Sequence, residues 1–320
     1  YTSSWARSLN DIRVDESADS KASGDAAQNI EESSTAAADT GMASGSYSET
    51  NVRQEGVDEG DTAKTDGTYL YVLKDKSDQI AIIDTRDNRM KQTATITVED
   101  VSEIQEMYLD IERNQLIAVC DGYVGGKWND DDYGYGQRAN TTAVTYDISD
   151  RENPKEVGRV SQSGYYNSSR IADGYLYLFS DYYVTLDGIT AKNPKSYIPL
   201  VNDNLIKETD ICLPSISKAD MYSIITSVSL ENPNETAHSK ALLADGGNLY
   251  VSNDNIYFYE NVWQYSGKDV TTIRKVSYES GKLTAGAQCK IDGYINDSFS
   301  IDEYDGYLRV VVTDGDTNSV

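Results

Sequence analysis

The stretch that decides the fold reads Asp66-Gly67-Thr68-Tyr69-Leu70-Tyr71-Val72. It joins an Asp-Gly turn to a segment in which Tyr alternates with Leu or Val, a pattern typical of a half-buried strand. The phrase returns as Asp173-Gly174-Tyr175-Leu176-Tyr177-Leu178, Asp245-Gly246-Gly247-Asn248-Leu249-Tyr250-Val251 and Asp305-Gly306-Tyr307-Leu308-Arg309-Val310-Val311, with a looser copy at Arg113-Asn114-Gln115-Leu116-Ile117-Ala118-Val119. Repetition at a spacing of roughly 45 to 75 residues is typical of an array of small β-sheets.

The segments between these copies continue the strand pattern. Alternating residues at 79–84, 92–98, 143–148 and 156–160 predict further strands, and the dipeptides Asn153-Pro154 and Asn232-Pro233 predict corners between the third and fourth strands of a sheet. We therefore predict an all-β fold, a β-propeller, here a partial ring of about four to five antiparallel blades. Each Asp-Gly copy is expected to begin an inner strand of a blade.

Composition divides the chain into two parts. Residues 1–46 are rich in Ser, Ala and acids and poor in aromatic and β-branched side chains, so they are predicted to be a disordered linker. Residues 47–320 are predicted to be the β-propeller domain, truncated at its C-terminal end, because the sequence stops just after a strand. We expect the chain to be a fragment of a longer protein.

The charge balance limits the partners. The chain has 28 Lys and Arg against 53 Asp and Glu, a formal net charge of −25, which repels the phosphates of nucleic acids. We therefore predict no nucleic-acid partner. The acidic surface is either simply solvated or holds Ca²⁺, which prefers several oxygen ligands. The 25 Tyr against 3 Phe suit strands that are buried on one side and wet on the other.

The densest polar cluster lies between two predicted strands of the second unit, in the segment Lys127-Trp128-Asn129-Asp130-Asp131-Asp132-Tyr133-Gly134. Asp130, Asp131 and Asp132 are candidate ligands for Ca²⁺, and the same carboxylates with Trp128 and Tyr133 are candidates to bind a sugar. The spacing fits the calcium loop of EF-hands poorly, and a plain solvated loop is the alternative. The long segments 122–142 and 187–220 are the predicted functional loops.

Two other features favour structural roles. The acids of Asp58-Glu59-Gly60-Asp61 precede the first blade and are predicted to close the ring or cap a blade. The chain has one histidine, His238, and no G-x-S-x-G elbow, so a Ser-His-Asp triad is not expected.

One block resembles a known family. It reads Tyr47-Ser48-Glu49-Thr50-Asn51-Val52-Arg53-Gln54-Glu55-Gly56-Val57-Asp58-Glu59-Gly60-Asp61, followed by Lys64-Thr65-Asp66-Gly67. It resembles the motif that opens the C-terminal β-propeller domain of secreted bacterial proteins distantly related to WD-repeat propellers. The resemblance implies an extracellular or cell-surface domain, tethered to the membrane only through an N-terminal anchor absent from this fragment. The family's activity is not established, so the resemblance implies no catalytic residue.

Three functional hypotheses follow from these observations. The leading one is a non-enzymatic binding scaffold at the bacterial cell surface, with a protein or glycan ligand. The second is a hydrolase of surface glycans or peptides that uses carboxylates near the propeller channel. The third is a calcium-stabilised adhesin.

Overall fold

The fold is that of a computed structural model. It describes residues 52–75, 77–86, 90–123, 139–184, 192–213, 219–244, 247–263, 269–315 and 317–319. Residues 45–320 form one compact unit, to which all of these ranges belong. The site residues Trp128, Asp130, Asp131, Asp132 and Tyr133 and the predicted linker 1–46 lie outside the described residues.

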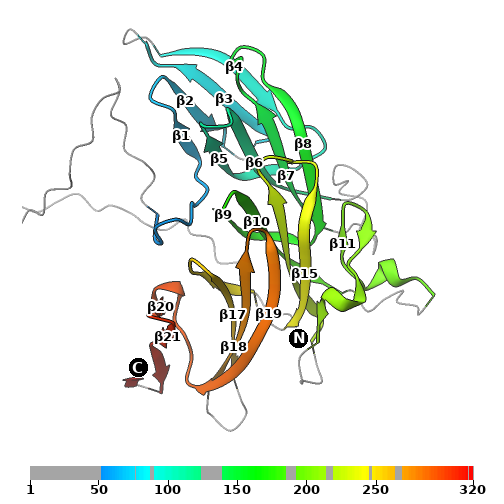
Figure 1. The fold of residues 1–320 in the computed structure, drawn as a ribbon, viewed down its shortest axis with the longest axis vertical. Helices are drawn as coiled ribbons and strands as arrows, with labels where there is room; N and C mark the ends of the chain where they lie inside the picture. Colours follow the sequence, from blue (N-terminus) through cyan, green and yellow to red (C-terminus); the bar gives the residue numbers. More distant parts are fainter. Residues whose placement is uncertain are drawn as a thin grey trace, which may run out of the picture. The chain divides into compact units, whose positions relative to one another are not determined.

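The described strands form successive antiparallel sheets (Figure 1), which confirms the all-β prediction. The first sheet has β1 (Ala63–Thr65), β2 (Tyr69–Leu73), β3 (Gln79–Asp84) and β4 (Lys91–Thr97) in chain order. The core of the second has β5 (Glu103–Asp110), β6 (Gln115–Tyr123), β7 (Ala139–Asp147) and β8 (Lys155–Ser163). The core of the third has β9 (Tyr165–Ala172), β10 (Tyr175–Tyr183), β14 (Met221–Ser229) and β15 (Thr236–Ala244).

The later strands repeat the same plan and then begin it again. The fourth sheet has β16 (Asn248–Val251), β17 (Asn255–Trp263), β18 (Asp269–Glu279) and β19 (Lys282–Asp292). Two hairpins follow, β20 (Ile301–Tyr304) with β21 (Tyr307–Val310) and β22 (Val312–Asp314) with β23 (Thr317–Ser319). Four four-stranded cores and the start of another agree with the predicted four to five blades.

The repeated phrase marks the turn between the first and second strands. Asp173 and Gly174 both have positive φ, 52° and 78°, and Asp305 and Gly306 repeat this with 50° and 75°. Such two-residue turns match the twist of paired strands and favour Gly and Asp. The phrase therefore begins the second strand of a sheet. The first strands β5 and β9, each eight residues long, were not predicted because they carry little of the alternation of Tyr with Leu or Val.

The copy at Asp245 also precedes an inner strand, as predicted, but this strand is the first of its sheet and not the second. In the fourth sheet the first-to-second turn is formed by residues 252–254, and β16, the first strand, already begins at Asn248. This copy therefore stands before the sheet rather than inside its first hairpin. Apolar alternation cannot distinguish the two positions, because both precede a strand with the same period.

The predicted corners at the Asn-Pro dipeptides are confirmed. Residues 148–154 connect β7 to β8, and residues 230–235 connect β14 to β15, in each case the third and fourth strands. The second corner also contacts the neighbouring sheet: a Cβ on Gly158 of β8 would lie 2.5 Å from Cβ of Pro233. Glycine at 158 therefore permits the close approach of the two sheets.

Each pair of neighbouring sheets shares an apolar cluster. Tyr71, Ile82, Met107 and Leu116 belong to the cluster between the first two sheets, and similar clusters join the second to the third and the third to the fourth. Buried Tyr hydroxyls find polar partners, as where Tyr278 donates to the Ser252 carbonyl at 2.6 Å. This pattern explains the excess of Tyr over Phe, because the ring packs while its hydroxyl reaches a turn.

The described part of the predicted loop 187–220 carries short strands. β11 (Leu200–Val201) pairs with β8, and β12 (Asn204–Leu205) pairs with β11. β13 (Ile211–Cys212) joins β15 in parallel. The insertion thus adds strands to the outer edges of both the second and the third sheet.

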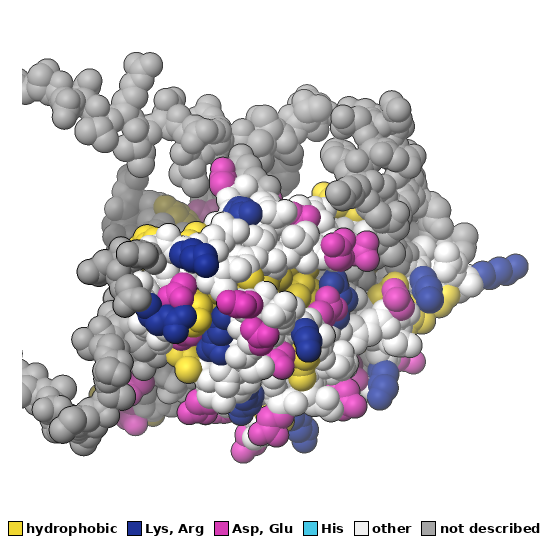
Figure 2. All heavy atoms as spheres, turned by 90° about the horizontal axis from the view of Figure 1, so that it is seen from above, with side chains coloured by type: hydrophobic (Ala, Val, Ile, Leu, Met, Phe, Trp, Pro, Cys, Tyr) yellow, Lys and Arg dark blue, Asp and Glu magenta, His cyan; other side chains and the backbone are white. Residues whose placement is uncertain are grey.

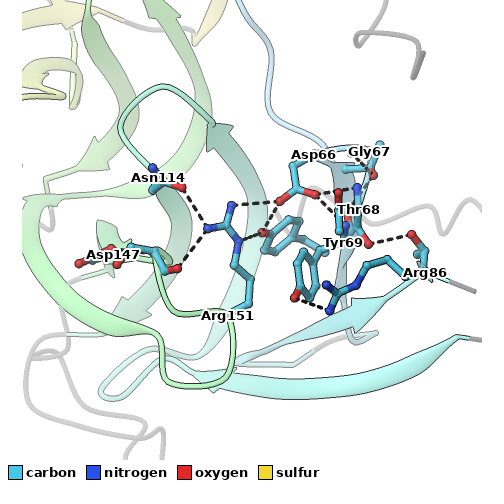
Figure 3. A network of polar contacts seen from close by, with 12 residues as sticks. Asp66, Gly67, Thr68, Tyr69, Arg86, Asn114, Asp147 and Arg151 are labelled. Carbon is cyan, nitrogen blue, oxygen red and sulfur yellow. Dashed lines mark hydrogen bonds and ion pairs between the residues drawn. The ribbon is translucent and has the colours of Figure 1, made fainter. Parts of the chain in front are cut away.

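A polar network joins the first two sheets through Arg151, in the corner after β7 (Figure 3). Its guanidinium donates to the Asp66 carboxylate at 3.1 Å, to the Tyr71 hydroxyl at 3.2 Å and to Asn114 Oδ1 at 3.0 Å. The Asp66 side chain is only 6% exposed. It also accepts backbone N–H groups from Thr68 and Tyr69 at 2.9 and 2.7 Å. Arg151 therefore ties together the first-to-second turns of two sheets.

Candidate functional site

Residues 52–62, which we call the crossing segment, pass along the first strands of several sheets. Asp61 exchanges two backbone hydrogen bonds with Met107 of β5, at 3.1 and 3.0 Å. Asp58 does the same with Ile171 of β9, at 2.8 and 3.0 Å. Farther back, Arg53 Nη2 donates to the carbonyl of Ile301 in β20 at 2.7 Å. One segment before the first strand thus contacts the second sheet, the third sheet and the hairpin of β20 and β21.

Side chains also hold the crossing segment in place. Val57 is 2% exposed and packs in the cluster between the third and fourth sheets. Glu59 pairs with Arg170 of β9 at 3.3 Å. Gly60 lies so close to Glu106 of β5 that a Cβ would overlap its carboxyl group. The acids of 58–61 therefore take part in pairing along the inner strands.

Two adjoining hollows open where the crossing segment passes the third and fourth sheets, and together we call them the inner cleft. The larger has a volume of about 650 Å³, and the polar residues in its lining include Asn167, Ser168, Asp181, Asn248 and Asn296. The smaller has about 190 Å³, and its lining includes Arg53, Glu59, Tyr250 and Phe299. Arg170, Leu249 and Ser298 belong to both linings.

A third hollow, of about 640 Å³, lies beside residues 56–65 of the chain. Its walls include Val57, Leu70, Leu109 and Ile171. Its charged groups are Lys64, which pairs with Asp58 at 3.5 Å, and the carboxylates of Asp61 and Asp173. Its polar groups come from the crossing segment, β1 and Asp173, whereas those of the inner cleft come from the third sheet, the fourth sheet and the residues before β20.

Asp181, at the end of β10, contributes a carboxyl group to the larger hollow. It accepts hydrogen bonds from Asn167 Nδ2 at 2.7 Å and from the Ser223 hydroxyl at 3.0 Å. Burial raises the pKa of Asp181 above its ordinary value, although these two donors act in the opposite direction. A Cβ at position 247 would overlap the Asp181 carboxylate, so only glycine fits there. The hollow therefore contains a carboxyl that takes up a proton more readily than an exposed Asp does.

The position of Asp181 recurs in the second and fourth sheets, where it links the sheet to the next segment of the chain. Asp181, Asp121 and Asn261 are each the seventh residue of their second strand. Asp121 accepts from the backbone N–H of Tyr166 in the next sheet at 2.8 Å, and Asn261 accepts from that of Ile295 at 3.1 Å. Asp181 and Asp121 each stand eight residues after the start of their copy of the phrase, at Asp173 and Arg113, whereas Asn261 stands sixteen residues after Asp245. Counting from the phrase would therefore have found two of the three positions.

Arg53 brings a positive charge to the smaller hollow. Its guanidinium carbon lies 4.7 Å from the ring centroid of Tyr250 and 5.1 Å from that of Phe299. Phe299 is 82% exposed. On the face shown in Figure 2, Asp and Glu side chains are interspersed with Lys and Arg, as the acidic composition leads one to expect.

The predicted sites at Trp128, Tyr133 and Asp130 to Asp132 fall in residues 124–138, between β6 and β7, where the structure gives no placement. Among the described residues, no group of three or more His, Cys, Asp and Glu is arranged to hold a metal ion. The calcium site therefore stays a prediction about residues beyond those ranges.

His238 takes part in hydrogen bonds between elements. Its Nδ1 accepts from the backbone N–H of Leu283 at 2.9 Å, so the neutral ring carries its proton on Nε2, which lies 3.2 Å from the Asp210 carboxylate. Asp210 also pairs with Lys240 at 3.2 Å. Burial opposes ionisation of Asp210, but Lys240 and His238 outweigh it and lower its pKa.

Comparison with known proteins adds a family and distant relatives. A sequence model described as "Beta propeller domain" matches residues 47–320. An uncharacterized protein of Methanocaldococcus jannaschii is 23% identical, and the match covers 84% of this chain and 50% of the relative. The chain thus spans about half the length of the curated relative it matches.

Two solved structures are also similar. A functionally unknown protein from Desulfotomaculum acetoxidans shares 10% identity, with 75% of this chain and 72% of that chain covered and a TM-score of 0.27. A protein from Lactobacillus plantarum shares 12% identity, with 70% and 68% covered and a TM-score of 0.23.

Proposed function

This chain belongs to the beta propeller domain family, and on that premise we propose that it is a binding scaffold whose glycan or protein ligand occupies the inner cleft. The observation that carries the proposal is the convergence of polar side chains from three successive units of the fold. Asn167 and Asp181 come from the third sheet, Asn248 from the fourth, and Asn296 precedes β20. A few convergent polar groups in a concave site are what orient a ligand.

We place this scaffold at the bacterial cell surface, tethered through an N-terminal anchor. The support is the resemblance of residues 47–67 to secreted bacterial proteins, together with an acidic surface that disfavours nucleic acids. Where the structure describes the chain, it contains no helix long and apolar enough to cross a membrane.

One observation favours a hydrolase as the second candidate. Asp181, whose pKa is raised by burial, lines the same hollow as Asp297. Glycoside hydrolysis uses two carboxyl groups, one protonated and one ionised, and a raised pKa is how the acid keeps its proton.

Binding of the 320-residue chain to arrays of surface glycans and peptides, followed by calorimetry on the best ligand, tests the proposal. Replacing Asn248, which is exposed in the larger hollow, by Ala should weaken binding roughly five-fold, the equivalent of about 1 kcal/mol for a hydrogen-bonding group. Asn204→Ala, at an exposed position of β12, is the matched control and should leave binding unchanged.

Equal affinity of both Asn variants for every ligand found would contradict the assignment to the inner cleft. Incubation of the same ligands with the chain distinguishes binding from hydrolysis. Cleavage that disappears in Asp181→Asn would replace the binding scaffold by the hydrolase.

A further inference from the structure

We infer that the ligand of the inner cleft is an acidic glycan whose carboxylate binds Arg53; this rests on the proposed function and narrows it to one ligand class. The inference begins from the pairing of arginines in the fold. The structure describes Arg53, Arg86, Arg113, Arg151, Arg159, Arg170, Arg274 and Arg309. In each of these except Arg53, a guanidinium nitrogen lies within 4 Å of a carboxylate oxygen of another described residue.

Arg53 has no carboxylate partner among the described residues. This is unexpected because acids outnumber bases in the chain, 53 to 28. Of the five N–H donors of a guanidinium, one bonds the Ile301 carbonyl at 2.7 Å. The group is exposed and lines the smaller hollow. Arg170, at the junction of the two hollows, is by contrast paired with Glu59 and donates to Ser168 at 2.7 Å. The guanidinium available to a ligand anion is therefore that of Arg53.

Arg53 is also held in one orientation before any ligand arrives. The rings of Tyr250 and Phe299 lie within 4.7 and 5.1 Å of its guanidinium carbon, and the Ile301 carbonyl fixes one edge. A planar guanidinium fixed in this way can bind a carboxylate through two parallel hydrogen bonds with little loss of rotamer entropy.

The surroundings of Arg53 favour a sugar over a peptide. Phe299 is 82% exposed beside the guanidinium, and an exposed aromatic face suits the C–H face of a sugar ring. Beyond Ser298, the lining of the larger hollow includes the amides of Asn248 and Asn296. The Nδ2 of Asn167 already donates to Asp181 and to the Gly247 carbonyl, and the carboxyl groups of Asp181 and Asp297 lie in the same lining. Amides both donate and accept, as the hydroxyl groups of a sugar do, so they suit successive neutral hydroxyls better than a run of acidic side chains.

The dependence of ligand affinity on salt concentration provides a separate test. The net charge of −25 repels an anionic glycan at long range, and at an ionic strength of 0.15 M that repulsion is screened beyond about 8 Å. A bidentate contact with Arg53 at hydrogen-bond distance is screened much less. We therefore expect affinity to be maintained or improved between about 10 mM and 150 mM salt.

The test uses the 320-residue chain and oligosaccharides of galacturonic, glucuronic and mannuronic acid, each beside its carboxyl-reduced, neutral counterpart. We expect at least one acidic member to bind about ten-fold more tightly than its neutral counterpart, the effect of one charge-assisted bidentate contact. Arg53→Gln should remove that preference, and Arg53→Lys should keep part of it. Arg86→Gln is the matched control, since Arg86 is paired with Asp84. Circular dichroism verifies that the variants fold.

The outcomes separate this inference from the function it rests on. Equal binding of acidic and neutral glycans, or a preference that persists in Arg53→Gln, would overturn the acidic class but leave the scaffold intact. Tetraglutamate binding as tightly as the uronates would assign the cleft to acidic peptides instead. Failure to bind any glycan or peptide on the arrays would refute the scaffold and this inference together.

Discussion

Replacing Arg151 by Met should weaken the joint between the first two sheets. The change removes the guanidinium that contacts the Asp66 carboxylate, the Tyr71 hydroxyl and Asn114, while Met keeps much of the aliphatic length. Asp66, only 6% exposed, is left without its cation. A buried charge that loses its partner is costly, because neither water nor another charge replaces it.

The cost can be bounded from the structure. Breaking a fully buried ion pair costs about 3–5 kcal/mol, but the Arg151 side chain is 17% exposed and Asp66 keeps the N–H groups of Thr68 and Tyr69. We therefore expect a loss of about 2 kcal/mol in the free energy of unfolding. For a compact unit that covers residues 45–320, that corresponds to a fall in Tm of roughly 3–4 °C.

Thermal and urea unfolding followed by circular dichroism measure the change. Arg86→Met is the matched control, because Arg86 pairs with Asp84 on the surface, where its side chain is 60% exposed and the pair stabilises little. A Tm for Arg151→Met within 1 °C of that for Arg86→Met would refute the reasoning.

The effect should also depend on pH. Burial opposes ionisation of Asp66, but Tyr69, Thr68, Arg151 and Tyr71 outweigh it and hold its pKa below the ordinary 3.8. A depressed pKa contributes stability that is fully present above 3.8 and is lost as the pH falls through the folded value. The gap between wild type and Arg151→Met should therefore be full at pH 7 and narrow below about pH 3.8. A gap that stays constant down to pH 2 would show that charge pairing is not its cause.

Two further predictions concern the contacts between sheets. Gly158→Ala places a Cβ against Pro233 and should lower the free energy of unfolding, measured in urea, by about 1–3 kcal/mol. In the control Gly122→Ala the nearest neighbour of the new Cβ would be 3.6 Å away, so the loss should be smaller. Equal losses would contradict the close approach of the sheets. Burial and the nearby charge of Glu103 raise the pKa of Asp121, although the hydrogen bond from the backbone N–H of Tyr166 lowers it. Ionisation of Asp121 therefore lowers the free energy of unfolding once the pH exceeds the folded pKa. Asp121→Asn should gain stability relative to wild type as the pH rises from 4 to 7, and a difference independent of pH would contradict this.

Much of the fold could be predicted because its signals are local. Alternating Tyr and Leu specify strands, and Asp173-Gly174 supplies the two positive φ angles of a tight hairpin. The corner at Asn153-Pro154 ends a strand for a reason that lies in the proline itself. Local alternation does not say which strand of a sheet each copy begins, and the copy at Asp245 precedes the first strand rather than the second.

The candidate site could not be predicted in the same way. Asn167, Asn248 and Asn296 share no motif, and only the fold brings them to one hollow. The position of Asp181 was within reach, since its counterpart Asp121 stands at the same distance from its own copy of the phrase. The sequence singled out 128–133 instead because consecutive acids are conspicuous in a chain whether or not they converge in space.

By itself, then, the sequence determined the strands, their turns and the repetition of the sheets, since each depends on neighbours a few residues apart. Tertiary structure alone decided that residues 52–62 pass along the inner strands and that Arg53 reaches Ile301, 248 positions away, with no acidic partner in the described part of the chain. The physical reason is that pairing and exposure depend on which distant residues meet. Periodicity along the chain carries no information about contacts between residues far apart in the sequence.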